Sequence, residues 1–167
     1  MKMTRNRGDD WLRVVLDSRL RTPGDAVVVA SDPGSTLIVH TADAADEDRA
    51  RLEAAGVELA ELPADELGRV DIDALLDLLG DRGISALLVE GGATVHGSFF
   101  DADFVDELFI FVAPTIIGGE APAAVGGLGA DTLELARRYA FDDVRRHDDD
   151  LELHCVRPED ADVHGSD

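Results

Sequence analysis

The chain has 167 residues, 45% of them hydrophobic, which is enough for one globular domain with its own core. Fifteen Lys and Arg residues against 36 Asp and Glu residues give a net charge of −21, which argues against nucleic acid or an anionic membrane as a partner. No apolar run approaches membrane-spanning length, no apolar segment follows the basic N-terminus as in a signal peptide, and the one cysteine excludes an internal disulfide. We therefore expect a cytoplasmic protein, and the even spread of acids favours a halophilic source over an acidic mesophilic one.

The first half of the chain alternates between short apolar runs and amphipathic stretches, which is typical of parallel βαβ units. One helix is expected up to about Ala55, with Thr41 or Asp43 as its N-cap, and a second from the N-cap Asp71 to Gly83. Strands are expected at residues 12–16, 26–30, 36–40 and 57–62.

The second half begins with an apolar run that has no polar face, at residues 85–89, so we expect a strand buried on both sides there. A loop rich in Ala, Pro and Gly reaches about Gly129, and two strands near the C-terminus predict an antiparallel hairpin. The elements expected in this half are a helix at residues 94–101 and strands at residues 108–112, 133–136, 139–146 and 151–156.

These elements together predict an α/β fold: a mixed, mostly parallel sheet flanked by helices, with an antiparallel hairpin at its end. We expect one domain over residues 12–157. A flexible N-terminus is predicted at residues 1–11, and a disordered acidic tail at residues 158–167.

The stretch around Glu90 carries the main functional signal. Glu90 follows the apolar run at residues 85–89 and precedes Gly91, Gly92 and the predicted first turn of a helix. Such a turn presents free backbone N–H groups, which bind phosphates of ligands. A purely structural turn is the alternative, because the segment has neither a Walker A lysine nor a Gly-x-Gly-x-x-Gly fingerprint. Glu90 itself is either a ligand contact or a solvated loop acid or helix cap.

Two further strand ends are candidates for the same site. Ser18 follows the first predicted strand, and its hydroxyl can bond a phosphate or a ribose while the neighbouring Arg19 pairs with an anion. Thr41 occupies a similar place after the strand at residues 36–40, and for both positions an ordinary turn is the alternative. The five histidines and Cys155 lack the spacing of metal ligands, so no metal site is expected.

Three segments, in order and at fitting spacing, resemble a known family. They are residues 12–23 (Leu-Arg-Val-Val-Leu-Asp-Ser-Arg-Leu-Arg-Thr-Pro), residues 89–92 (Val-Glu-Gly-Gly) and the stretch from residue 105 to residue 119. Together they resemble the riboflavin-biosynthesis pyrimidine reductases, which comprise the reductase domain of the bifunctional bacterial deaminase/reductase and its stand-alone archaeal relatives. The resemblance covers about residues 12–156 and implies a dihydrofolate-reductase-like fold.

The resemblance implies an NADPH-dependent oxidoreductase that passes a hydride to C1 of the ribosyl group of a (di)amino-ribosylamino-pyrimidine 5′-phosphate, giving the ribityl product. Glu90 would contact this small-molecule substrate. The cofactor would be held by Ser18, Thr41, Gly91, Gly92, Ala93, Thr94, Val95, His96, Gly97 and Ser98. The chemistry needs no metal, since an oriented hydride donor carries the hard step, and a homodimer is the family habit.

The chain departs from the family pattern at its N-terminus. Family members begin with a strand, a Ser-Leu-Asp-Gly-like loop, a helix and a Gly-x-x-Thr segment, whereas this sequence begins just before the strand at residues 12–16. A truncated reading frame, a split enzyme and a degenerate paralogue are the competing explanations. We expect an uncovered sheet edge, and a chain that alone is inactive or self-associates. The functional alternatives are another dihydrofolate-reductase-like reductase and a non-catalytic nucleotide-binding or subunit-partner protein.

Overall fold

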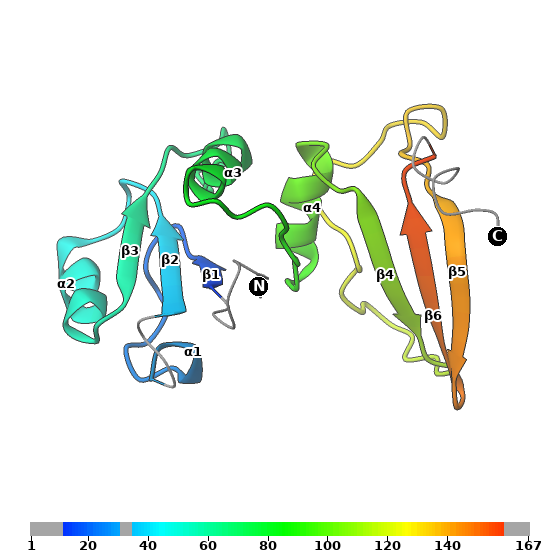
Figure 1. Ribbon diagram of the computed structural model, residues 1–167, viewed down its shortest axis with the longest axis horizontal. Coiled ribbons are helices and arrows are strands. Elements are labelled where there is room, and N and C mark those ends of the chain that lie inside the picture. The colour runs from blue at the N-terminus through cyan, green and yellow to red at the C-terminus, as the bar shows by residue number, and fades with distance from the viewer. Residues whose placement is uncertain (1–11, 31–34, 159–167) are drawn as a thin grey trace. The chain divides into compact units, whose positions relative to one another are not determined.

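The computed structural model describes residues 12–30 and 35–158, which form two compact units divided between Gly91 and Gly92. Each unit contains its own three-stranded sheet (Figure 1). The flexible N-terminus predicted at residues 1–11 lies outside the described residues, as does all of the predicted tail beyond Pro158. The single domain predicted over residues 12–157 stays a prediction, and each unit is described by itself.

The first unit is built on a parallel sheet with the strand order β1-β2-β3. Its strands are β1 (Arg13–Leu16), β2 (Thr36–His40) and β3 (Glu58–Glu61). All five residues of β2 are buried, because this strand has a neighbour on each side and carries the apolar run Leu-Ile-Val. Three of the predicted strands are thereby confirmed.

The helices of the first unit are α1 (Val27–Ala30), α2 (Asp46–Ala54) and α3 (Ile72–Asp81). Helix α3 begins as predicted, because the Asp71 side chain accepts a hydrogen bond from the N–H of Ala74 at 2.8 Å. The N-cap predicted for α2 is wrong: this helix starts after Ala45, and Thr41 and Asp43 precede it. One buried hydrophobic cluster of the unit consists of Leu20, Val29, Ile38, Ala44, Leu52 and Val57.

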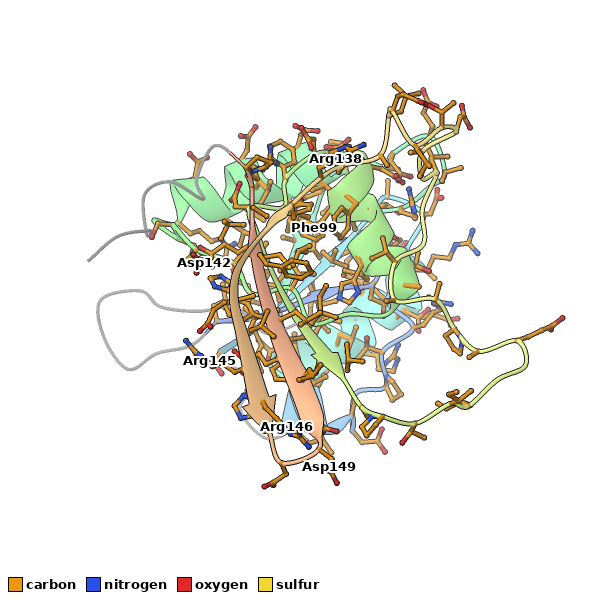
Figure 2. The ribbon with its side chains drawn as sticks, turned by 90° about the vertical axis from the view of Figure 1, so that its right-hand side faces the viewer. Phe99, Arg138, Asp142, Arg145, Arg146 and Asp149 are labelled. Carbon is orange, nitrogen blue, oxygen red and sulfur yellow. The ribbon has the colours of Figure 1, made fainter. Side chains whose placement is uncertain are left out.

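The second unit contains one helix and an antiparallel sheet with the strand order β4-β6-β5. Its elements are α4 (Ala93–Asp101), β4 (Glu107–Val112), β5 (Ala140–His147) and β6 (Asp150–Val156). The predicted hairpin is confirmed as β5 and β6, and the α/β class is confirmed. Phe99 of α4, labelled in Figure 2, is buried, as are Cys155 and Val156 at the end of β6.

Three predicted strands are wrong, and in each case the segment has no paired neighbour. Residues 27–30 form α1 instead, closed by a hydrogen bond from the N–H of Ala30 to the carbonyl of Ala26. Residues 133–136 form turns, with Leu133 81% exposed. Residues 85–89 lie outside any strand, because a strand needs a partner for its backbone groups.

Among the described residues, no helix is both long and apolar enough to cross a membrane.

The N-cap of α3 gives a direct test of the first unit. We expect Asp71→Ala to lower the free energy of unfolding by about 1 kcal/mol, because the N–H of Ala74 loses its acceptor. Urea denaturation followed by circular dichroism measures this loss. Asp77→Ala, at an exposed position inside the same helix, removes a carboxylate without removing a cap and serves as the control. An equal loss of stability in both variants would contradict the assigned cap.

Candidate functional site

Ser18 and Thr41 meet at the carboxyl edge of the parallel sheet. The N–H and the hydroxyl of Thr41 both donate hydrogen bonds to the carbonyl of Ser18, at 3.1 Å and 3.0 Å. The Ser18 hydroxyl accepts a hydrogen bond from the N–H of Val70 at 3.2 Å. A serine hydroxyl that accepts in this way still has its own proton to donate to a ligand oxygen. Open α/β sheets bind ligands at this edge, and the role of both residues in a ligand site stays a prediction.

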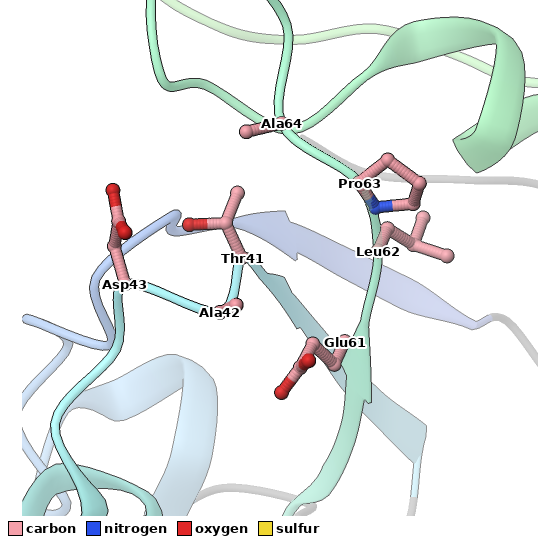
Figure 3. Close-up of a pocket in the computed structure, with 7 residues that line it drawn as sticks. All are labelled: Thr41, Ala42, Asp43, Glu61, Leu62, Pro63 and Ala64. Carbon is pink, nitrogen blue, oxygen red and sulfur yellow. The ribbon is translucent and has the colours of Figure 1, made fainter.

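A pocket of about 370 Å³ opens beside Thr41, between the segments that follow β2 and β3 (Figure 3). Asp43 and Glu61 place two carboxylates on its wall. The residues lining it are Thr41, Ala42, Asp43, Glu61, Leu62, Pro63 and Ala64. Apart from Thr41, the sequence analysis did not single out these residues for a site, because nothing in the sequence shows that the ends of β2 and β3 lie side by side.

A buried histidine supports the same edge. His40, the last residue of β2, is fully buried, and its Nδ1 lies 2.9 Å from the carbonyl oxygen of Thr41. A carbonyl can only accept, so Nδ1 carries the proton and Nε2 accepts from Arg49 Nη1 at 3.3 Å. Arg49 also pairs with Glu61, with Nη2 2.9 Å from Oε2. The His40 ring thus connects the strand end to the pocket wall through Arg49, and sequence reasoning missed it because His40 belongs to no spaced motif.

Asp17 fixes the turn that presents Ser18. Its Oδ2 accepts hydrogen bonds from the N–H and the hydroxyl of Thr22, at 2.6 Å and 2.7 Å. Burial acts to raise the pKa of the Asp17 carboxyl, but these two hydrogen bonds and the backbone N–H groups of Arg21 and Arg19 outweigh it and lower the pKa. Asp17 is therefore an ionised structural residue that holds the loop after β1.

The glycine turn forms the start of α4. Gly92 is the N-cap with extended backbone, and a Cβ added to it would meet nothing within 4 Å. The first N–H groups of a helix have no acceptor within the helix, and anion binding at this turn stays a prediction. The Ser98 hydroxyl instead donates to the carbonyl of Thr94 at 3.1 Å, and the N–H of Gly126 donates to the carbonyl of Ala93 at 2.8 Å.

Gly97 has a structural reason to be glycine. A Cβ at this position would collide with the backbone of Gly126 and Gly127, which cross the helix here. His96 Nδ1 lies 2.9 Å from the carbonyl oxygen of Ala124 in the same loop. Close packing of a loop against α4 therefore accounts for Gly97, and its predicted contact with a cofactor stays a prediction.

Glu90 is exposed and lies in irregular chain before α4, not at the end of a strand as predicted. Ser18 and Thr41 belong to the first unit, as do Glu90 and Gly91, whereas the segment from Gly92 to Ser98 belongs to the second. The structure thus brings Ser18 and Thr41 together. Within the described residues, no group of three or more His, Cys, Asp or Glu side chains is arranged to hold a metal ion.

Comparison with known proteins identifies a family. Residues 2–149 match the family described as the RibD C-terminal domain. The riboflavin biosynthesis protein RibD of Bacillus amyloliquefaciens is 34% identical over 146 residues, which cover 87% of this chain and 38% of the relative. The 2,5-diamino-6-ribosylamino-4(3H)-pyrimidinone 5′-phosphate reductase of Methanothermobacter thermautotrophicus is 37% identical over 141 residues, which cover 80% of this chain and 63% of the relative.

A solved structure supports the same assignment. RibD of Acinetobacter baumannii matches with a TM-score of 0.67 and 25% identity, over 86% of this chain and 37% of the other chain. This chain therefore spans less than two thirds of the length of each of these relatives.

The lowered pKa of Asp17 predicts how stability depends on pH. A carboxyl with a lower pKa in the folded than in the unfolded state stabilises the fold above its unfolded pKa, and this contribution disappears as the pH falls through the folded pKa. We expect Asp17→Asn to cost about 1–3 kcal/mol at pH 7. The difference in unfolding free energy between this variant and the wild type should narrow on acidification below 3.8, the ordinary pKa of an aspartate carboxyl.

Thermal melts of both proteins between pH 7 and pH 3 measure this effect. Asp25→Asn, an exposed change in the same loop, is the control and should leave the stability nearly unchanged. A stability difference between wild type and Asp17→Asn that stayed constant across the range would refute the role of the ionised carboxylate.

Proposed function

We propose that this chain, which belongs to the RibD C-terminal domain family, supplies the reductase function of riboflavin biosynthesis. The observation that carries the proposal is the match over residues 2–149, together with 37% identity to an archaeal pyrimidinone phosphate reductase. The substrate would be a (di)amino-ribosylamino-pyrimidine 5′-phosphate. Because the chain spans only part of these relatives, the activity is a proposal for this chain and not a property carried over from them.

The reaction would convert a ribosyl group into a ribityl group. C1 gains a hydride, its bond to the ring oxygen breaks, and that oxygen takes up a proton. A reduced nicotinamide dinucleotide supplies the hydride when bound. The protein must therefore bind the dinucleotide and the substrate, orient them and exclude water. We propose that Glu90 contacts the substrate, where a carboxylate can accept hydrogen bonds from sugar hydroxyls or pyrimidine amino groups.

Each unit by itself has polar groups of the kind that bind a dinucleotide. The hydroxyls of Ser18 and Thr41 lie at the strand ends where ribose and phosphate groups bind in open sheets. The start of α4 offers the backbone N–H groups of residues 93–95 for a pyrophosphate, and the open side of Gly92 lets a phosphate approach the main chain. These residues fit a dinucleotide by the chemistry of their donors.

NADPH is the dinucleotide that we propose. Arg19 follows Ser18 directly and is exposed, so its guanidinium can pair with a 2′-phosphate. The carboxylates of Asp43 and Glu61 on the wall of the pocket repel an anion inside it. The 2′-phosphate would therefore have to approach from the side of Arg19. We also propose a homodimer, a cytoplasmic location and a halophilic source, the last supported by the net charge of −21.

A non-catalytic nucleotide-binding or subunit-partner role is the second candidate, because this chain spans only 63% of the archaeal reductase that it matches. The two candidates differ in what the chain must bind. A reductase binds both the dinucleotide and the pyrimidine phosphate, whereas a partner protein need bind only the dinucleotide or neither.

The glycines of α4 give a matched pair of variants for the dinucleotide site. Gly92→Ala should leave folding unchanged, because the added methyl meets open space, yet it should weaken NADPH binding on the order of tenfold by crowding the pyrophosphate. Gly97→Ala should lower the stability of the second unit by about 1–3 kcal/mol, because its methyl collides with the loop backbone.

Nicotinamide fluorescence measures the binding, and thermal melts measure the folding of both variants. If Gly92→Ala binds NADPH as well as the wild type, the pyrophosphate does not lie at the start of α4.

Glu90 tests the substrate site. Glu90→Gln should weaken binding of the ribosylamino-pyrimidine phosphate by about tenfold, since hydrogen bonds to a charged group are worth about 1.5–3 kcal/mol. The melting temperature should not change, because Glu90 is exposed. Calorimetric titration of the substrate in the presence of NADP⁺ measures this. Failure of the wild type to bind the substrate, or a large loss of thermal stability in Glu90→Gln with normal binding, would refute the assignment.

A further inference from the structure

An arginine of α2, which the proposed dinucleotide contacts do not include, holds the loop after β1. Arg51 donates hydrogen bonds from Nη1 to the carbonyl of Thr22 at 2.7 Å and from Nη2 to the carbonyl of Leu20 at 2.8 Å. Its Nη2 also lies 2.8 Å from Oδ1 of Asp48 in the same helix. One planar guanidinium thus joins α2 to two backbone positions of the loop at residues 17–22.

The loop needs this support because of the backbone conformation of Leu20. Its φ angle is 55°, in the left-handed region that residues other than glycine adopt at a cost in free energy. Its side chain is fully buried in the hydrophobic cluster that also contains Leu52 of α2. A residue in such a conformation persists only where its surroundings fix it, and for Leu20 these surroundings include the bond from Arg51 to its carbonyl.

The same loop is also fixed at Ser18. The carbonyl of Ser18 accepts two hydrogen bonds from Thr41, and its hydroxyl accepts one from the N–H of Val70. Arg19 therefore lies between two neighbours, Ser18 and Leu20, whose backbone positions are both held by tertiary contacts. Because backbone dihedral angles decide which rotamers a side chain can adopt, these contacts limit where the Arg19 guanidinium can lie.

We propose that Arg51 is a positioning residue that makes the chain select a dinucleotide with a 2′-phosphate, and that it acts through Arg19. This inference rests on the proposed function, in which the Arg19 guanidinium pairs with the 2′-phosphate of NADPH. Such a pair is strong when the guanidinium is already oriented, and it is weak when a long side chain must be ordered on binding. Arg51 therefore favours NADPH over NADH without contacting either of them.

A lysine at this position keeps the positive charge but cannot hold the loop. The ammonium group carries its three donors on one nitrogen, whereas the guanidinium spreads its donors over a rigid fork that reaches both carbonyls. Arg51→Lys therefore removes the geometry without changing the net charge. Arg82→Lys is the matched control, because Arg82 follows α3 in the same unit and pairs with Glu58 at 2.8 Å.

The test measures the dissociation constants of the 167-residue chain for NADPH and for NADH by nicotinamide fluorescence. The selectivity is the Kd for NADH divided by the Kd for NADPH. Both constants come from one preparation, so a smaller folded fraction leaves the selectivity unchanged. We expect a selectivity of about ten or more in the wild type, a decrease of about fivefold in Arg51→Lys and no change in Arg82→Lys.

A double-mutant cycle checks that Arg51 acts through Arg19. Arg19→Gln removes the guanidinium and should bring the selectivity close to one. Arg51→Lys combined with Arg19→Gln should lower the selectivity no further, because no guanidinium is left to position. An equal decrease on replacing Arg51 in the presence and in the absence of the Arg19 guanidinium would overturn the proposal.

The outcomes separate this inference from the proposed function. A wild-type chain that binds neither dinucleotide would overturn both. A wild-type chain that binds NADPH and NADH equally well, or a selectivity that survives in Arg51→Lys, would overturn the positioning role alone. If Arg51→Lys fails to fold, Asp48→Asn releases the guanidinium from its carboxylate and should lower the selectivity about twofold, and an unchanged selectivity in that variant would overturn the proposal.

Discussion

A β-strand forms only where its backbone groups find a partner, and this constraint governs most of the structure. β2 satisfies it on both sides and is buried along its whole length. The run at residues 85–89 has an equally apolar composition but remains irregular. Within the described part of the second unit, β4 pairs with β6 alone. Composition therefore decides which segments can be strands, and the available neighbours decide which of them are.

The same constraint explains how much of the fold could be read from the sequence. Strands at residues 36–40 and 108–112 were predictable because their apolar runs are long enough and have neighbours. The cap of α3 was predictable because Asp71 bonds to a group only three residues away. The strand at residues 85–89 was wrongly predicted, because pairing depends on distant segments that local pattern does not reveal. For the same reason the run at residues 26–30 was assigned to the wrong kind of element.

Dependence on distant contacts also decided which residues of the candidate site could be predicted from the sequence. Glu90, Ser18 and the glycine turn stood out because each follows an apolar run, and Ser18 does lie against Thr41 at the sheet edge. His40 and Arg49 escaped notice because they are nine residues apart and interact only after β2 and α2 have packed. Gly97 looked like part of a phosphate loop, whereas its nearest neighbours are backbone atoms of Gly126 and Gly127. The sequence thus did not reveal the roles of residues that act through tertiary contacts.

The crossing of α4 by the loop near Gly126 divides that long loop into two parts with different freedom. Residues 124–129 are attached to the helix through the carbonyl of Ala93, the ring of His96 and the carboxylate of Asp101, which accepts from the N–H of Leu128 at 2.9 Å. Residues 113–123 are exposed throughout. Evolutionary insertions and deletions should therefore accumulate in the earlier part, while the later part keeps its length and its small residues across species.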